Sequence, residues 1–276
     1  MTEIIQAIVQ GIVQGITEWL PISSTGHLLL LNDLWPMSGG ADFYNVFKVV
    51  VQLGSILAVL VLFFHTLNPF SGKKTDEEKR GTWLLWVKVL VASIPAAVIG
   101  LAIDDIVDEK LSVPVVIAAA LIIYGIAFIW MESRKSRTPH VDSLAKISYP
   151  NALGIGVFQM LALIPGTSRS GSTILGATLL GTSRSVAAEF SFFMAIPAMA
   201  GASGLKLVKA LIIDNITFSG LQWITLFTGT LVAFLISLVV IRFLMRFIKK
   251  HTFKPFGIYR IALGVLVLVY AYFTMK

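Results

Sequence analysis

The sequence predicts an all-α membrane protein that crosses the bilayer several times. Of its 276 residues, 56% are hydrophobic and only 13% are charged, whereas about a quarter of the residues in soluble domains are charged. The mean hydropathy is +0.84, and several apolar runs reach the ~20 residues that a helix needs to cross a bilayer. The sequence contains no cysteine, which excludes disulfides and thiolate chemistry.

Eight apolar segments follow one another along the chain, and six of them are unbroken. We expect these six to be membrane-spanning helices, over 43–66, 83–103, 113–131, 185–211, 221–245 and 256–274. Pro, Gly and Ser interrupt the other two segments, 3–35 and 150–182, near the middle. Non-helical backbone at membrane depth persists only where protein or a wet cavity surrounds it. Both segments are therefore predicted to be re-entrant helix–loop–helix hairpins.

The charged residues between the apolar runs predict the orientation of the chain. Basic residues gather in three connections, which contain Lys73, Lys74, Lys79 and Arg80, then Arg134, Lys135, Arg137 and Lys146, then Arg246, Lys249, Lys250 and Lys254. The alternate connections contain Asp104, Asp105, Asp108 and Glu109, or Asp214. The positive-inside rule places the basic connections in the cytoplasm and both termini outside. The net charge of +7 therefore reflects topology, and no nucleic-acid partner is expected.

The two halves of this single membrane domain, 1–276, follow one plan. Residues 1–131 and 150–276 each contain a broken hairpin followed by three spans, and an odd number of spans inverts the second half. With an offset of 145 residues, Gly11-Ile12-Val13-Gln14 aligns with Gly156-Val157-Phe158-Gln159, and Ser23 aligns with Ser168. Inverted-topology repeats bring two broken segments together near the bilayer midplane, where such proteins bind their substrates.

The two hairpin loops, PISSTGH at 21–27 and PGTSRSGST at 165–173, concentrate polar groups in an apolar chain. They offer hydroxyls, glycine N–H groups, the Arg169 guanidinium and the His27 imidazole, with Glu18 one turn before the first loop. A helix N-terminus follows each loop, so this cup suits a multiply charged oxyanion. Phosphate is favoured because a guanidinium donates two parallel hydrogen bonds. The predicted ligand-binding residues are Gln14, Ser23, Thr25, Gly26, Gly166, Ser168, Ser170, Gly171 and Thr173.

Three further residues have structural interpretations. Gln52 lies within a span and is either structural or part of the cavity lining. Trp19 suits the aromatic belt at the membrane interface, and Arg260 suits an interfacial anchor whose side chain snorkels, with an ion pair to the core as the alternative. Several catalytic motifs are missing, among them the nucleotide-binding loop G-x-x-x-x-G-K-[ST] and the zinc motif H-E-x-x-H. The four histidines are scattered along the chain, so a zinc site is not expected.

Five stretches carry a recognisable pattern: QGITEWLPISSTGH, FKVVVQLGSILAV, PGTSRSGST, AAEFSFFMAIPAM and KPFGIYR. Together they resemble the bacterial undecaprenyl-diphosphate phosphatase family, which is also known for bacitracin resistance, and the similarity runs through nearly the whole chain. The glutamate-rich motif of that family has Glu or Gln, three residues, then Glu. Here it reads Gln14 to Glu18, so only Glu18 supplies a charge.

The resemblance implies an enzyme that hydrolyses undecaprenyl diphosphate to undecaprenyl phosphate and inorganic phosphate, and so recycles the lipid carrier for peptidoglycan synthesis. It implies a divalent cation, Mg²⁺ or Ca²⁺, with Glu18 as a ligand, and a site in the bacterial inner membrane that faces the external side. Glu18, Ser24, His27 and Arg169 would be the principal catalytic residues. The nucleophile is left open between Ser24 activated by His27, His27 itself, and water, and a homodimer is left open as the oligomeric state.

A second class of function is a secondary transporter or flippase for an anionic lipid or solute. Inverted repeats with broken helices are typical of such carriers. The placement of His27 beside Ser24 and Glu18 favours the enzyme, because a carrier needs binding groups but no acid–base pair. In both cases the expected partners are the lipid bilayer and an anionic substrate, which for the enzyme is a long-chain prenyl diphosphate.

Overall fold

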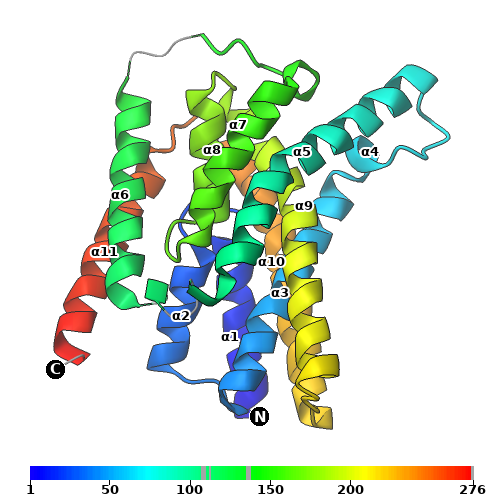
Figure 1. The fold of residues 1–276 in the computed structure, drawn as a ribbon. Coiled ribbons are helices and arrows are strands. Elements are labelled where there is room, and N and C mark those ends of the chain that lie inside the picture. Colours follow the sequence, from blue (N-terminus) through cyan, green and yellow to red (C-terminus); the bar gives the residue numbers. More distant parts are fainter. Residues whose placement is uncertain (107–109, 112, 135–137, 275–276) are drawn as a thin grey trace.

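The computed structural model describes residues 1–106, 110–111, 113–134 and 138–274, which form a bundle of helices (Figure 1). Of the loop residues used to orient the chain, Asp108, Glu109, Lys135 and Arg137 lie outside the described residues. The helices are α1 (Thr2–Thr17), α2 (Ser24–Leu34), α3 (Gly40–Leu62), α4 (Phe64–Leu67), α5 (Asp76–Ile106), α6 (Pro114–Ser133), α7 (Tyr149–Met160), α8 (Arg169–Leu179), α9 (Arg184–Val208), α10 (Gly220–Phe247) and α11 (Lys254–Thr274). The predicted all-α class is confirmed.

Six helices in the described part of the chain are long and apolar enough to cross a membrane, as predicted. They are α3, α5, α6, α9, α10 and α11, and they lie close to the predicted spans. The largest difference is in α5, which begins at Asp76 rather than at residue 83. Thr75 and Glu78 form a reciprocal cap there, with Thr75 N–H donating to Glu78 at 2.7 Å and Glu78 N–H donating to Thr75 at 3.2 Å. This polar cap extends the helix beyond the apolar run that predicted it.

Two pairs of shorter helices, α1–α2 and α7–α8, occupy the segments predicted to be hairpins. Each connecting loop ends at a serine with positive φ, 76° at Ser23 and 72° at Ser168. The Ser23 hydroxyl accepts a hydrogen bond from Gly26 N–H at 3.3 Å, and the Ser168 hydroxyl accepts one from Gly171 N–H at 3.1 Å. Each serine therefore caps the helix that follows it. Figure 1 shows the two pairs extending from opposite ends of the bundle. Their re-entrant placement and the inverted repeats stay predictions.

Trp19 lies in the core of the bundle. Its side chain is fully buried, and its ring packs edge-on against Phe192 of α9 with centroids 5.2 Å apart. The prediction that Trp19 belongs to the interfacial aromatic belt is therefore wrong. The residue follows the end of α1, where the chain turns into the interior of the bundle, so its position along the sequence did not reveal its depth.

Close backbone contact holds α7 against α5. A Cβ atom at Gly156 would overlap the carbonyl oxygen of Ala92. We expect Gly156→Ala to destabilise the fold by about 1–3 kcal/mol, because a well-packed interface must separate to admit the methyl group. The measurement is the Tm of the purified protein in detergent. Gly201→Ala in α9 is the matched control, since no heavy atom lies within 4 Å of its Cβ position. A Tm unchanged by Gly156→Ala would contradict this packing.

Candidate active site

A cavity of about 140 Å³ lies where the α1–α2 loop meets the α7–α8 loop. Helices α2 and α8 both begin at this cavity, and the positive ends of their dipoles favour a negatively charged ligand there. Seven of the predicted site residues line it, namely Glu18, Ser23, Ser24, Thr25, Gly166, Ser168 and Arg169. Two residues from membrane spans, Gln52 and Met199, complete one wall. Gln52 therefore lines the cavity, which is one of the two roles that its position within an apolar span leaves open.

The carboxylate of Glu18 is the centre of the hydrogen-bond network. Its Oε2 accepts hydrogen bonds from the Ser24 hydroxyl at 2.7 Å and from the Gln14 side chain at 3.1 Å. Its Oε1 accepts from Arg169 Nη2 at 3.1 Å, in an ion pair that is largely buried. Glu18 follows the last residue of α1, where the helix dipole disfavours a negative charge, and Arg169 compensates for this. The Ser24 hydroxyl therefore faces a base within hydrogen-bond reach.

Several buried polar atoms around this network have no hydrogen-bond partner among the described residues. They include Gln14 Oε1, Trp19 Nε1 and Arg169 Nε. The second terminal nitrogen of Arg169, Nη1, donates to Ser191 O at 2.9 Å, which fixes the guanidinium in place. A buried donor without a partner costs about 1–3 kcal/mol. Such a cost is common at sites that a ligand completes.

His27 does not line the cavity. Its Nδ1 donates to Ser23 O at 2.6 Å, and its Nε2 then accepts a hydrogen bond from the Tyr259 hydroxyl at 2.7 Å. Burial lowers the pKa of the imidazole, while the hydrogen bond to Ser23 raises it and the charge of Arg260 lowers it. Both ring nitrogens are thus engaged away from Ser24. The structure pairs Ser24 with Glu18, and does not support activation of Ser24 by His27.

Arg260 connects the two loops. Its side chain is fully buried, and its guanidinium donates to Pro21 O at 3.0 Å in the first loop and to Gly166 O and Thr167 O at 2.9 Å in the second. Two longer contacts, at 3.4 Å, reach the α6 backbone. The prediction that Arg260 snorkels to the membrane interface is therefore wrong. Its donors are satisfied by backbone carbonyls from three separate segments, which no local sequence pattern reveals.

Gly166 sits at a point where another residue would not fit. Its φ is +92°, and a Cβ atom would lie 2.5 Å from the carbonyl oxygen of Ile117 in α6. Glycine alone adopts this backbone conformation readily and permits this approach. Gly26 and Gly171 have a different role from the predicted one, because their N–H groups bond to Ser23 and Ser168 and are not free for a ligand.

The other predicted ligand-binding residues lie behind the cavity wall. Gln14 donates to Glu18, as described above. The Ser170 hydroxyl lies 3.1 Å from Glu18 O and 3.3 Å from Leu20 O, so it joins the second loop to the first. The Thr173 hydroxyl lies 2.6 Å from the Ser191 hydroxyl of α9. These side chains position the residues that face the cavity.

The cavity offers one carboxylate to a metal ion. Within the described ranges, no group of three His, Cys, Asp or Glu residues could hold a metal. Mg²⁺ usually binds through one or two carboxylates together with substrate phosphate oxygens and water. Glu18 therefore fits an ion that arrives with a diphosphate, and the residues present do not form a complete cage for one.

Comparison with known proteins gives consistent matches. A family model described as bacitracin resistance protein BacA matches residues 7–266. The chain is 55% identical to an undecaprenyl-diphosphatase of Streptococcus thermophilus, over 97% of this chain and 93% of the relative. It is 54% identical to undecaprenyl-diphosphatase 1 of Clostridioides difficile, over 98% and 97%. It is also 54% identical to an undecaprenyl-diphosphatase of Lactiplantibacillus plantarum, over 100% and 99%.

The role of Arg260 as a connection between the loops can be tested by stability. Arg260→Met leaves three loop carbonyls without their donor, and each unpaired buried group costs about 1–3 kcal/mol. We expect a loss of about 3 kcal/mol or more, seen as a large fall in Tm in detergent. Arg260→Lys should fall between this variant and the wild type, since an ammonium cannot reach all the carbonyls. Arg242→Met, at an exposed position of α10, is the control. Equal Tm values for the two methionine variants would rule this role out.

Proposed function

The chain belongs to the family of bacitracin resistance protein BacA, and we infer from this that it is an undecaprenyl-diphosphatase. It hydrolyses undecaprenyl diphosphate to undecaprenyl phosphate and inorganic phosphate, which recycles the lipid carrier of peptidoglycan synthesis. It is a multi-pass membrane protein whose substrate is a prenyl diphosphate. The main observation in support of this chemistry is that Ser24 and Arg169, the first residues of α2 and α8, both contact the buried carboxylate of Glu18.

We propose that Ser24 is the nucleophile and Glu18 its general base. As the Ser24 oxygen bonds to the terminal phosphorus, Glu18 Oε2 takes the hydroxyl proton across the 2.7 Å hydrogen bond. The bond from that phosphorus to the bridging oxygen breaks, and undecaprenyl phosphate leaves. Water then attacks the phosphoserine, and Glu18 returns its proton to the departing Ser24 oxygen and accepts one from the attacking water. Inorganic phosphate departs, and Glu18 releases its proton to solvent before the next turnover.

Arg169 and the N-termini of α2 and α8 would hold the phosphoryl oxygens. The Nε–H of Arg169 is buried and unpaired within the described structure, so it is available as a donor to the transferring group. Preorganised donors of this kind stabilise the charge that develops during phosphoryl transfer. A divalent cation, Mg²⁺ or Ca²⁺, held by Glu18 and the diphosphate, would offset the charge of the substrate.

The predicted topology supports a location for the site. The charge distribution of the loops supports a bacterial inner-membrane protein with both termini outside, and the α1–α2 pair extends from the end of the bundle where the termini lie (Figure 1). We propose that the cavity opens toward this external side, and that the prenyl chain lies along the apolar spans that border it. A transporter or flippase would not require the hydrogen bond between Ser24 and Glu18, so this contact favours the enzyme. The homodimer stays a prediction.

Phosphate release from undecaprenyl diphosphate, by the purified protein in detergent with Mg²⁺ or Ca²⁺, tests the proposed function. We expect Ser24→Ala to lower kcat about 10³-fold or more, because it removes the proposed nucleophile together with the proton transfer to Glu18. Arg169→Ala should lower it about 10²-fold to 10³-fold, as for the loss of a donor to the developing charge. Ser237→Ala, a buried serine of α10, is the control. A folded wild-type protein that releases no phosphate with either metal would favour the carrier.

A separate prediction is that Ser24, rather than His27, is the nucleophile. After rapid mixing with substrate and acid quench, we expect one phosphoryl group on the peptide that contains Ser24. His27→Ala should retain more activity than Ser24→Ala, with a loss of about 10-fold to 10²-fold, because His27 touches the loop backbone rather than the cavity. A phosphoryl group on His27, or inversion of configuration at the transferred phosphorus with no trapped adduct, would overturn the proposed nucleophile, since two successive displacements through phosphoserine retain the configuration.

A further inference from the structure

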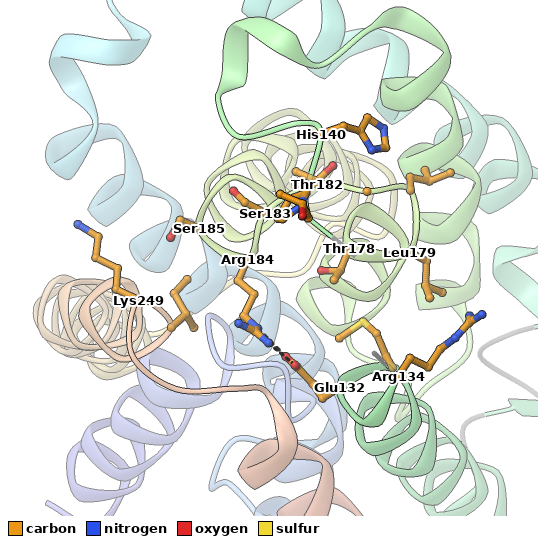
Figure 2. Close-up of a pocket in the computed structure, with 16 residues that line it drawn as sticks. Glu132, Arg134, His140, Thr178, Leu179, Thr182, Ser183, Arg184, Ser185 and Lys249 are labelled. Carbon is orange, nitrogen blue, oxygen red and sulfur yellow. Dashed lines mark hydrogen bonds and ion pairs between the residues drawn. The ribbon is translucent and has the colours of Figure 1, made fainter. Parts of the chain in front are cut away.

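A second and larger cavity, of about 830 Å³, lies at the opposite end of the bundle from the chain termini. Its walls come from the end of α6, the α8–α9 connection, the start of α9 and the segment after α10 (Figure 2). It shares no lining residue with the catalytic cavity. The ends of three candidate membrane spans meet here, on the side where the basic connections lie. The positive-inside rule therefore places this cavity at the cytoplasmic surface of the membrane.

The inner wall of this cavity is polar, and one of its buried hydroxyl groups has no hydrogen-bond partner among the described residues. Thr182 is only 2% exposed and lines the cavity, yet its hydroxyl has no hydrogen-bond partner in the part of the chain that the structure describes. Two residues later α9 begins at Arg184, and the first N–H groups of a helix have no intrahelical acceptor. The 25-residue α9 also contributes the positive end of its dipole. An anionic group fits both features.

Positive side chains surround the opening. Figure 2 shows Lys249 and Arg134 on opposite sides of the cavity, with Arg184 between them. Glu132 is the one acid among the lining residues, and it is already neutralised. Arg184 forms an ion pair with it, and the N–H of Phe253 donates to its carboxylate at 3.0 Å. Arg134 lies over the Trp130 ring at 4.7 Å, and Lys249 interacts electrostatically with Glu189 of α9, which does not line the cavity. Three basic residues against one acid still give the cavity lining a net positive charge.

We propose that this cavity binds the phosphate-bearing headgroup of an anionic phospholipid of the cytoplasmic leaflet. The recognised chemistry is a phosphate group, which a free phosphate ion would share. The volume favours a headgroup, since cavities of about 300–1,000 Å³ accommodate molecules much larger than one phosphate. The position at the ends of membrane spans also places the cavity at headgroup level, where basic pockets between helices bind anionic lipids. The exposed side chain of Leu179 lies at the rim, where an acyl chain would leave.

Isothermal titration of the full chain in neutral detergent tests this proposal. The probes are short-chain phosphatidylglycerol, short-chain phosphatidylcholine as the headgroup without net charge, and inorganic phosphate. We expect saturable binding of phosphatidylglycerol, weakened about 30-fold by the double variant Arg134→Gln/Lys249→Gln, since each basic residue contributes about fivefold. Thr182→Val, which keeps the shape of the side chain, should weaken it about fivefold. Phosphatidylcholine should bind more weakly to the wild type.

Two control variants locate the binding. Lys250→Gln removes a neighbouring charge that does not line the cavity, and Arg169→Ala disables the catalytic cavity. Both should keep the wild-type affinity for phosphatidylglycerol. Equal affinities of the wild type and the Arg134/Lys249 variant would overturn the proposal, as would loss of binding in Arg169→Ala. Inorganic phosphate that binds more tightly than the lipid, and is lost in the same variants, would assign the cavity to free phosphate instead.

Discussion

The buried guanidinium of Arg260 is the contact on which the organisation of the catalytic centre depends. A loop inside an apolar bundle exposes backbone carbonyls that no lipid can satisfy, and each unpaired group is costly. One side chain from α11 resolves this for both loops, because its donors reach Pro21, Gly166 and Thr167 together. Hydrogen bonds to those carbonyl groups offset the free-energy cost of burying the charged guanidinium. The same cation also raises the local positive potential beside a cavity for an anion.

The ion pair between Glu18 and Arg169 joins the two loops at the reacting centre. It places the Glu18 carboxylate beside the Ser24 hydroxyl in a buried site. In the proposed reaction, a diphosphate that enters the cavity would meet Arg169 while this residue is still engaged with Glu18. Its binding would redistribute the hydrogen bonds of Glu18 and Arg169, and the unpaired Nε–H of Arg169 would give the phosphoryl group a first donor.

The sequence predicts the features that depend on a short stretch of neighbouring residues. Long apolar runs identified six spans, and two polar interruptions identified loops that share one cavity, including Glu18, Ser24 and Arg169. Features that depend on distant partners could not be predicted in this way. Arg260 bonds to carbonyls that lie 93 to 239 residues away. The sequence leaves open whether His27 activates Ser24, and the structure holds its ring instead between Ser23 O and the Tyr259 hydroxyl.

The distribution of these contacts along the chain has a consequence for biogenesis. The first loop is synthesised before the second, and Arg260 follows Thr167 of the second loop by 93 residues. Until α11 has inserted, both loops lack the donor that satisfies their carbonyls. A nascent chain arrested before α11 would therefore contain Glu18, Ser24 and Arg169 without an ordered cavity around them. We expect the two loops to adopt their final arrangement only after α11 has inserted and docked.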